Sequence, residues 1–342
     1  MFLFNTIDKK VLKNRVMEKR EERKTFSFYR YVKIEDPHDF RDQLYLALNE
    51  IGIFGRIYLA QEGINAQISS LVDRLDDLKK VLEKFPILSA MRLNEALCEP
   101  SYSFYKLIIK VRKKIVADGL KEIDLQKVGK KIKAEEFNQL ANDKDAVIID
   151  VRNHYETEVG HMKKAVLFDG ETFRSQLPKL LSHLELEGKK EKPIAMYCTG
   201  GIRCEKASAY LIEHGFKNVS MLDGGIISYV SEVKKKQLRN EFIGKNFVFD
   251  ARLGERVTED IISNCHQCGA VCDDHTNCLN DECHLLFIQC KSCREKMQGC
   301  CSDRCIQIIN LPIEKQRELR RSKVKKNAHH VYRKGFHKAL LS

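Results

Sequence analysis

The sequence predicts a multidomain protein that combines α/β and α+β folds with a small cysteine-rich region. Three observations support this fold class. Strand and helix patterns alternate through the first third of the chain, short apolar runs separated by helical patterns follow, and ten of the 13 cysteines lie between Cys265 and Cys305. With 342 residues, of which 43% are hydrophobic, the chain is long enough for two or three domains, each with its own core.

Residues 25–116 form the first expected domain. Its strand and helix patterns are separated by turn and stop signals such as Gly52, Gly63 and Pro86. The expected elements are a strand at 25–33, a helix at 40–51, strands at 55–60 and 65–69, a helix at 71–85 and a strand at 104–116. Their order, β-α-β-β-α-β, predicts a ferredoxin-like domain, and this fold serves too many functions to select one.

Residues 117–134 are predicted to be a charged connector, and residues 135–237 a second domain of the α/β type. Three continuous apolar runs in this domain have the composition of buried parallel strands. The runs lie at 146–150, 194–198 and 219–222, and helices are expected at 171–184 and 205–214. Pro178 argues against one unbroken helix in the first helical segment.

The formal charge of the chain is +12, and most of the excess lies at the C-terminal end. Residues 311–342 contain ten Lys and Arg but only two Glu. A basic arm of this kind suits an anionic partner such as nucleic acid. The alternative interpretation is a solvated, disordered tail.

We expect a cytoplasmic protein that makes no membrane contact. No run approaches the ~18 consecutive apolar residues of a membrane-spanning helix. Lysines follow the short apolar start of the charged segment 1–24 too closely for a signal peptide. The odd number of cysteines and the C-x-x-C pairs fit metal binding or redox chemistry in a reducing compartment better than a secreted disulfide scaffold.

The loop after the second apolar run carries the most informative residues. In order, these are Cys198, Thr199, Gly200, Gly201, Ile202, Arg203 and Cys204. Backbone N–H groups of a glycine turn and a helix N-terminus favour an anion at Cys198, and Arg203 adds positive charge at the rim, so the thiol pKa should be lowered. The loop therefore predicts a reactive Cys198. The alternative is that the glycines only make a tight turn.

This loop and its surroundings resemble the rhodanese family. The matching residues are Asp150-Val151-Arg152, Gly160-His161, the loop 198–204 and Asp223-Gly224-Gly225. The resemblance implies a sulfur carried as a persulfide on Cys198. Four residues separate Cys198 from Arg203, as in sulfurtransferases, whereas related phosphatases have five, which argues against phosphatase activity. Cys204, where many rhodaneses have Ser, is either a resolving thiol or an inert substitute for a helix N-cap.

Asp150, Arg152 and Glu156 are candidate supporting residues of this loop. Their charges admit a catalytic interpretation, but ion pairs that hold the strand ends together are the favoured explanation. His161 is expected to be a packed turn histidine rather than a catalytic base.

The resemblance extends over most of the chain, from about residue 20 to about residue 310. The segments 55–69 (GRIYLAQEGINAQIS), 196–207 (MYCTGGIRCEKA), 242–257 (FIGKNFVFDARLGERV) and 265–278 (CHQCGAVCDDHTNC) occur in the order typical of the bacterial, oxygen-dependent tRNA uridine(34) hydroxylases. The resemblance implies an oxidoreductase that converts the wobble uridine in the anticodon loop of tRNA to 5-hydroxyuridine. Its co-substrates would be O2 and an unspecified reduced donor, and Cys198 matches the essential cysteine of the family.

The residues suggest how such chemistry could begin. A thiolate or persulfide that adds to C6 of uracil makes C5 electron-rich. The target base is unpaired in the anticodon loop, so it can enter a pocket at low cost. The sequence contains no haem motif, Rossmann fingerprint or evident iron triad, and it leaves open the activation of O2, the choice of tRNA and the oligomeric state.

The cysteine-rich region 238–310 is predicted to bind metal. Two C-x-x-C pairs, Cys265/Cys268 and Cys290/Cys293, have the spacing of a tetrahedral zinc site with four thiolates. The remaining thiols are enough for a second site, but the sequence does not select four of them. The candidates are Cys272, Cys278, Cys283, Cys300, Cys301 and Cys305. Structural zinc is favoured over an iron–sulfur cluster, and unmetallated thiols or disulfides are the remaining alternative.

Two further groups of residues are candidates for RNA contact. Lys245, Arg252 and Arg256 share one segment with Phe247 and Phe249, and this mixture of basic and aromatic residues suits nucleic acid but also an ordinary strand pair with core aromatics. In the first domain, Arg56 and the polar residues near the expected turn either contact RNA or cap that turn. These polar residues are Glu62, Asn65 and Gln67.

Two other functions stay open from the sequence. One is a persulfide-carrying sulfurtransferase that uses the same Cys198, and the other is a non-catalytic module that binds zinc and RNA. The basic arm and the two additional domains argue against the first, because a plain sulfurtransferase needs neither. The intact loop 198–204 argues against the second.

Overall fold

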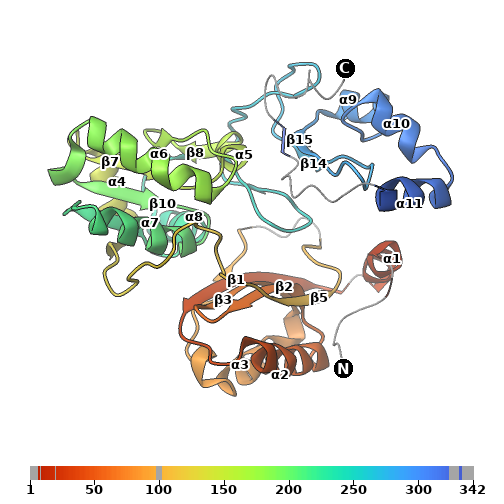
Figure 1. Cartoon of the computed structure of the whole chain (residues 1–342), viewed down its shortest axis with the longest axis horizontal. Helices are drawn as coiled ribbons and strands as arrows, with labels where there is room; N and C mark the ends of the chain where they lie inside the picture. The colour runs from red at the N-terminus through yellow and green to blue at the C-terminus, as the bar shows by residue number, and fades with distance from the viewer. Residues whose placement is uncertain (1–6, 8, 20, 98–101, 323–330, 333–342) are drawn as a thin grey trace.

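We describe a computed structural model of the chain, covering residues 7, 9–19, 21–97, 102–322 and 331–332. Figure 1 shows an N-terminal sheet with its helices, a central α/β domain and a smaller C-terminal part as three neighbouring bodies. Most of the predicted basic tail 311–342 lies outside the described residues. In the described part of the chain, no helix has the length and apolar character needed to cross a membrane.

The N-terminal domain has the predicted ferredoxin-like order, with one difference at the sheet edges. A helix, α1 (Lys9–Lys19), precedes it. Its elements are β1 (Arg23–Tyr31), α2 (Pro37–Glu50), β2 (Phe54–Ala60), β3 (Gly63–Leu71), η1 (Val72–Arg74), α3 (Leu75–Glu83), η2 (Pro86–Leu88), β4 (Asn94–Glu95) and β5 (Leu107–Val111). The sheet order is β4-β1-β3-β2-β5.

The long strand expected at 104–116 is much shorter in the structure, where only β5 (Leu107–Val111) forms within that range. The unpredicted β4 takes the edge beside β1, and β5 ends at Val111 and pairs in parallel with β2 at the other edge. The chain then leaves the sheet at the charged run Arg112–Lys114, which breaks the apolar pattern.

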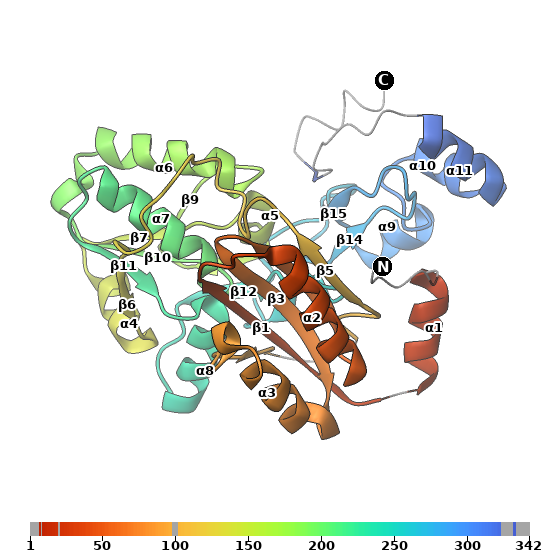
Figure 2. The same cartoon turned by 60° about the horizontal axis from the view of Figure 1, so that its bottom comes forward.

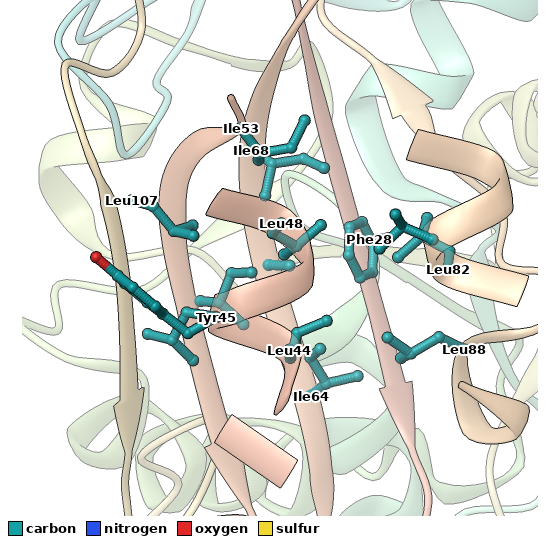
Figure 3. Close-up of a cluster of buried hydrophobic side chains, with 14 of the residues drawn as sticks. Phe28, Leu44, Tyr45, Leu48, Ile53, Ile64, Ile68, Leu82, Leu88 and Leu107 are labelled. Carbon is teal, nitrogen blue, oxygen red and sulfur yellow. The ribbon is translucent and has the colours of Figure 1, made fainter. Parts of the chain in front are cut away.

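Alternation along the strands gives the N-terminal sheet two different faces. Helices α2 and α3 cover one face (Figure 2), where Ile57, Ile64 and Ile68 are fully buried. Figure 3 shows Ile64 and Ile68 beside Leu44 and Leu48 of α2, and Ile57 belongs to the same cluster. The other face carries polar and aromatic side chains and is turned toward the central domain.

The central domain confirms the predicted parallel strands, with β7 (Val147–Asp150), β10 (Ile194–Tyr197) and β11 (Val219–Leu222) paired in parallel. The sheet order is β6-β11-β10-β7-β9, with β6 (Lys130–Ile132) and β9 (Val166–Leu167) at the edges. The helices are α4 (Ala134–Asn142), α5 (His154–Thr157), α6 (Phe173–Leu186), α7 (Ile202–Glu213) and α8 (Gly225–Lys236), with η3 at Lys189–Glu191.

Neighbouring residues of each central strand face opposite layers of helices. Val147 and Ile149 pack in the cluster that contains α6 and α7, whereas Ile148 packs in the cluster that contains α4 and α8. Helix α6 runs unbroken through Pro178, contrary to the sequence expectation. Proline removes only one backbone hydrogen bond in the second turn, and burial of the apolar face of α6 outweighs that loss.

The C-terminal part is joined to the central domain by strand pairing. Strand β12 (Phe242–Asn246) pairs with β8 (Gly160–Met162) of the central domain and with β13 (Glu255–Arg256). A hairpin of β14 (His275–Asn277) and β15 (Leu286–Ile288) follows. The last helices are α9 (Lys291–Lys296), α10 (Asp303–Ile309) and α11 (Ile313–Ser322).

A buried lysine connects the N-terminal domain to the helix that follows the loop 198–204. The ammonium of Lys206, on α7, has no exposed surface and pairs with Asp118 and, at 2.7 Å, with Glu62 of the turn between β2 and β3. Glu62 also accepts a hydrogen bond from the backbone N–H of Ile115. Glu62 therefore acts in interdomain packing, as the partner of Lys206 and of the Ile115 backbone.

Replacing Lys206 with Met should destabilise the full-length chain by about 3 kcal/mol, because Asp118 and Glu62 lose their shared cation in a buried position. The measurement is the free energy of unfolding in denaturant. Lys217→Met is the matched control, since Lys217 pairs with Glu191 on the surface and should change stability by less than about 0.5 kcal/mol. Equal effects of the two substitutions would contradict the assignment.

Candidate active site

The loop after β10 places the sulfur of Cys198 at the N-terminus of α7. The backbone N–H of Gly201 donates a hydrogen bond to Cys198 Sγ at 3.1 Å. Gly201 has a φ of +99°, which only glycine adopts readily, and it is the N-cap of α7. The helix begins at Ile202, three residues before the predicted start, so Arg203 and Cys204 lie in its first turn.

The surroundings of Cys198 favour its thiolate. Burial raises the thiol pKa, but a hydrogen bond from Cys204, the guanidinium of Arg203 and the backbone N–H groups of Arg203 and Gly201 outweigh burial and lower the pKa to about 6. Burial and the neighbouring thiolate raise the pKa of Cys204 well above its ordinary value. Cys198 is thus the thiolate at neutral pH, and Cys204 is the thiol that donates to it.

This geometry also bears on the two interpretations of Cys204. The N-cap of α7 is Gly201, and Cys204 is the third residue of the helix, so it does not substitute for a cap. Both side chains are fully buried. The thiolate of Cys198 is close enough to raise the pKa of Cys204, so the interpretation as a resolving thiol stays open.

Arg203, expected at the rim of the loop, lines the cavity beside Cys198 and is buried against Glu156. The guanidinium binds both carboxylate oxygens of Glu156, at 2.5 and 2.8 Å. The hydroxyl of Thr199 donates to the same carboxylate at 3.3 Å. Glu156 therefore fixes the orientation of Arg203 and offsets its charge in the protein interior.

The other supporting residues form a separate ion pair. Arg152 binds Asp150 at 2.6 Å and the carbonyl of Gly160 at 2.6 Å, and both charged side chains are fully buried. This pair joins the end of β7 to the start of β8. His161 donates from Nδ1 to the carbonyl of Met162, at 2.9 Å, and is absent from the lining of the cavity beside Cys198.

A cavity of about 600 Å³ lies beside Cys198, and three parts of the chain build its wall. The N-terminal sheet contributes Tyr29, Arg56, Tyr58, Asn65 and Gln67. The loop contributes Cys198, Thr199, Gly200, Ile202 and Arg203, and the segment after β12 contributes Val248, Phe249, Asp250, Arg252 and Glu255. Residues from all three bodies therefore line the cavity at Cys198.

The polar face of the N-terminal sheet forms one side of this cavity. Gln67 of β3 is paired with Ser27 of β1 on one side and with Arg56 of β2 on the other. Asn65 of β3 is paired in the same way with Tyr29 and Tyr58. Gln67 donates to the side-chain oxygen of Asn65 at 2.8 Å. The sequence placed Arg56, Asn65 and Gln67 near a turn. The signal that it missed is their alternation with buried Ile57, Ile64, Ala66 and Ile68.

Two hydroxyls of β1 attach this sheet to the start of α7. The hydroxyl of Tyr29 donates to Glu205 at 2.9 Å, and that of Tyr31 donates to the carbonyl of Ile202 at 3.1 Å. The sequence gave no sign of either contact, because the partners are more than 170 residues apart.

The three cations predicted to contact RNA from the C-terminal part are all paired with carboxylates. Lys245 binds Asp273 at 3.0 Å, Arg256 binds the same aspartate at 2.7 Å, and Arg252 binds Asp250 at 2.6 Å. Arg252 is nearly fully buried and lines the cavity, and the side chain of Phe247 is buried in the core. Local carboxylates thus offset the charge on which the RNA prediction for these residues relied.

Eight of the ten cysteines of the C-terminal part gather into two groups of four. The first consists of Cys265, Cys268, Cys290 and Cys293, the set selected from the sequence. The second consists of Cys278, Cys283, Cys301 and Cys305. Within each group all sulfur atoms lie within 4.8 Å of one another, so each group can hold a metal ion.

Comparisons with known proteins identify the family. Three family models match: residues 23–115 match the UPF0176 acylphosphatase like domain, 133–232 the rhodanese-like domain and 243–306 the rhodanase C-terminal domain. A curated tRNA uridine(34) hydroxylase from Pectobacterium carotovorum subsp. carotovorum is 51% identical over 321 residues, which are 93% of this chain and 90% of that protein. The chain belongs to the tRNA uridine(34) hydroxylase family.

A second curated relative agrees with this assignment. A tRNA uridine(34) hydroxylase from Leptospira interrogans is 50% identical over 327 residues, which are 95% of this chain and 89% of that protein. Among solved structures, the rhodanese-like domain of an Anabaena sp. protein matches with 21% identity and a TM-score of 0.27. That match covers 33% of this chain and 78% of that one.

The thiolate of this family member can be tested through the pH dependence of alkylation. Iodoacetamide should modify Cys198 with a midpoint near pH 6, because the lowered pKa leaves it ionised above that pH. Cys204→Ala should move the midpoint upward, since the hydrogen bond to the thiolate is removed, whereas Cys204→Ser keeps a donor and should move it less. Site-resolved mass spectrometry of the modified peptides gives each rate. An unchanged midpoint in Cys204→Ala would refute the proposed hydrogen bond.

Proposed function

We propose that this protein hydroxylates C5 of the wobble uridine, position 34, in tRNA and produces 5-hydroxyuridine. The observation that carries the proposal is the Cys198 thiolate beside a cavity in a chain about half identical to proteins named tRNA uridine(34) hydroxylase. A buried thiolate with a lowered pKa is suited to nucleophilic attack.

The first step of the proposed reaction is addition of Cys198 to the base. A bond forms between Sγ and C6 of uracil, and the electron pair of the C5=C6 bond moves to C5 and the C4 carbonyl as an enolate. Arg203, held by Glu156, lies beside the sulfur and stabilises negative charge there. The thiol of Cys204 is placed to supply and recover a proton at the same position.

The oxidation balances with O2 and a reduced donor. One oxygen atom enters at C5, and the other leaves as water with two electrons and two protons from the donor. Loss of the C5 proton and departure of the thiolate then restore the C5=C6 bond. This chemistry needs an electron-rich C5, which the addition of Cys198 supplies. O2 and the reduced donor are proposed here as the two co-substrates.

The cavity is suited to a flipped-out pyrimidine. Its volume of about 600 Å³ is within the range of small-molecule sites. Asn65 and Gln67 offer amide donors and acceptors to the polar edge of uracil, and Tyr29 and Tyr58 offer ring surfaces. An anticodon base is already unpaired, so its entry costs little.

Phosphate contacts are proposed at the cavity mouth and in the C-terminal arm. Arg56 is exposed, lines the cavity and has no carboxylate partner among the residues that the structure describes. The segment 311–342 adds ten Lys and Arg. With tRNA as substrate, we place the protein in the cytoplasm.

We also propose zinc at the first cysteine group, Cys265, Cys268, Cys290 and Cys293. The backbone N–H of Cys290 donates to the sulfur of Cys265 at 3.3 Å, and that of Cys293 donates to the sulfur of Cys290 at 3.5 Å. Such N–H donors orient and stabilise thiolates that bind zinc. The role there is structural, since the four ligands leave no open position.

A sulfurtransferase is the second candidate, favoured by one observation. Cys204 faces Cys198 and could resolve a persulfide formed on it. The domains on either side of the rhodanese-like domain and the basic arm argue against this role, because a plain sulfurtransferase needs none of them. The lowered pKa of Cys198 argues against a purely RNA-binding role.

The decisive experiment is nucleoside mass spectrometry of tRNA incubated with the full-length protein, O2 and a reductant. The wild type should form 5-hydroxyuridine, and Cys198→Ser should reduce its formation by at least 1,000-fold, about 4 kcal/mol of transition-state stabilisation. Cys272→Ser, which removes a thiol that lies outside the loop and outside both cysteine groups, is the control with unchanged activity. A thiolated nucleoside as the product would instead establish the sulfurtransferase.

The salt dependence of tRNA binding tests the contribution of the arm. Deleting residues 311–342 should flatten the plot of log affinity against log salt by about 0.7–0.9 for each phosphate that the arm neutralises in the wild type. Lys80→Gln, on α3 behind the N-terminal sheet, should leave the slope unchanged. A slope that survives the deletion would place the phosphate contacts elsewhere.

A further inference from the structure

We propose that the second cysteine group is a second tetrathiolate zinc site and that the two sites stabilise each other. This group consists of Cys278, Cys283, Cys301 and Cys305. This inference concerns the C-terminal part alone and does not depend on the proposed chemistry of Cys198. The sequence supplied the thiols without a choice among them. The fold brings these four together and leaves Cys272 and Cys300 outside both groups.

The spacing of the sulfur atoms fits one small metal ion. A zinc ion with four bonds of about 2.3 Å requires neighbouring thiolates to be about 3.8 Å apart. The sulfur of Cys301 lies 3.6 Å from that of Cys283 and 3.8 Å from that of Cys305. An iron–sulfur cluster distributes its thiolates among several iron atoms and holds them farther apart, so the compact group favours a single ion.

The ligands of the second group also have polar support of the kind seen around the first. The side-chain N–H of Asn280 donates to the sulfur of Cys305 at 3.4 Å, in a buried position. Amide donors at sulfur stabilise the thiolate form and fix its direction. Asn280 additionally accepts from the backbone N–H of Glu282 at 3.1 Å, which shapes the turn that leads to Cys283.

The order of the ligands along the chain interleaves the two sites. Each site has two pairs of ligands, and one pair of the other site lies between them in the sequence. The order is 265/268 in the first, 278/283 in the second, 290/293 in the first and 301/305 in the second. Each ion therefore closes a loop that contains half of the other site, and loss of one releases a segment that the other needs.

Hydrogen bonds connect the two sites directly. Gln267, between the first two ligands of the first site, donates to the carbonyls of Cys300 and Cys301 at 3.1 and 3.3 Å. Gln289 donates to Gln267 at 2.9 Å and to the carbonyl of Cys300 at 3.2 Å. These bonds hold the ligand turns in fixed relative positions.

The apolar core of this region is too small to replace the metals. In its two buried clusters, most buried side chains are cysteines, joined by a few apolar residues such as Phe247, Leu285, Phe287 and Ile288. Small modules with so little apolar burial depend on metal or disulfide staples. A second ion anchors α10 through Cys305 and the hairpin of β14 and β15 through Cys278.

The first measurement is the metal content of the full-length protein purified without chelators. We expect two zinc ions per chain. Cys301→Ser should lower the content to one or fewer, and the ion that remains should be released to a chelator at least tenfold faster than in the wild type. Cys272→Ser and Cys300→Ser are matched controls in the same module and should keep two ions with unchanged release. One ion per chain in the wild type, unaffected by Cys301→Ser, would overturn the proposal.

Cobalt substitution provides a readout that does not require loss of a ligand. Two equivalents of Co²⁺ should give the absorption of tetrahedral thiolate sites, and Cys305→His should keep both ions while shifting the bands of only one. A spectrum complete after one equivalent, or a disulfide between Cys283 and Cys301 in the purified protein, would overturn the second site. Cys198→Ser should retain both ions, so failure of the hydroxylase proposal would remain distinguishable.

Discussion

The buried contacts of Lys206 join the N-terminal sheet to the helix that carries the reactive loop. Because Lys206 follows Cys204 by two residues on α7, its pairing with Glu62 and Asp118 fixes the start of that helix against the polar face of the sheet. The hydroxyls of Tyr29 and Tyr31 add contacts at the same junction. The cavity beside Cys198 exists only while this junction holds, since the sheet supplies one of its walls.

Charge in this interior is arranged in local pairs. Arg203 lies close enough to Cys198 to lower its pKa, yet the carboxylate of Glu156 holds the guanidinium, and a buried cation without such a partner would be costly. The thiolate is favoured by several small contributions, from Cys204, Arg203 and two backbone N–H groups, that together outweigh burial. This division explains how a fully buried cysteine can be ionised while the surrounding fold stays stable.

The C-terminal part is held against the central domain by strand pairing and an ion pair. Its strand β12 extends a small sheet from the central domain, and the segment after β12 forms a wall of the cavity beside Phe249 and Arg252. His266, next to Cys265, binds Glu158 of the central domain at 2.9 Å. The cysteine groups thus lie beside the elements that complete the site, which links the order of this small region to the shape of the cavity.

The sequence by itself determined the features that depend on neighbouring residues. Local strand patterns in the first domain and continuous apolar runs in the second located most strands of the two sheets. The residues from Cys198 to Arg203 singled out the candidate loop, and the two C-x-x-C pairs selected the first cysteine group. Only the tertiary structure decided the pairing of Arg203 with Glu156, the choice of four thiols for the second group, and the position of Arg56, Asn65 and Gln67 on the cavity wall. These contacts join residues tens to more than a hundred positions apart. No local period encodes them, because they arise from how separately folded elements pack together.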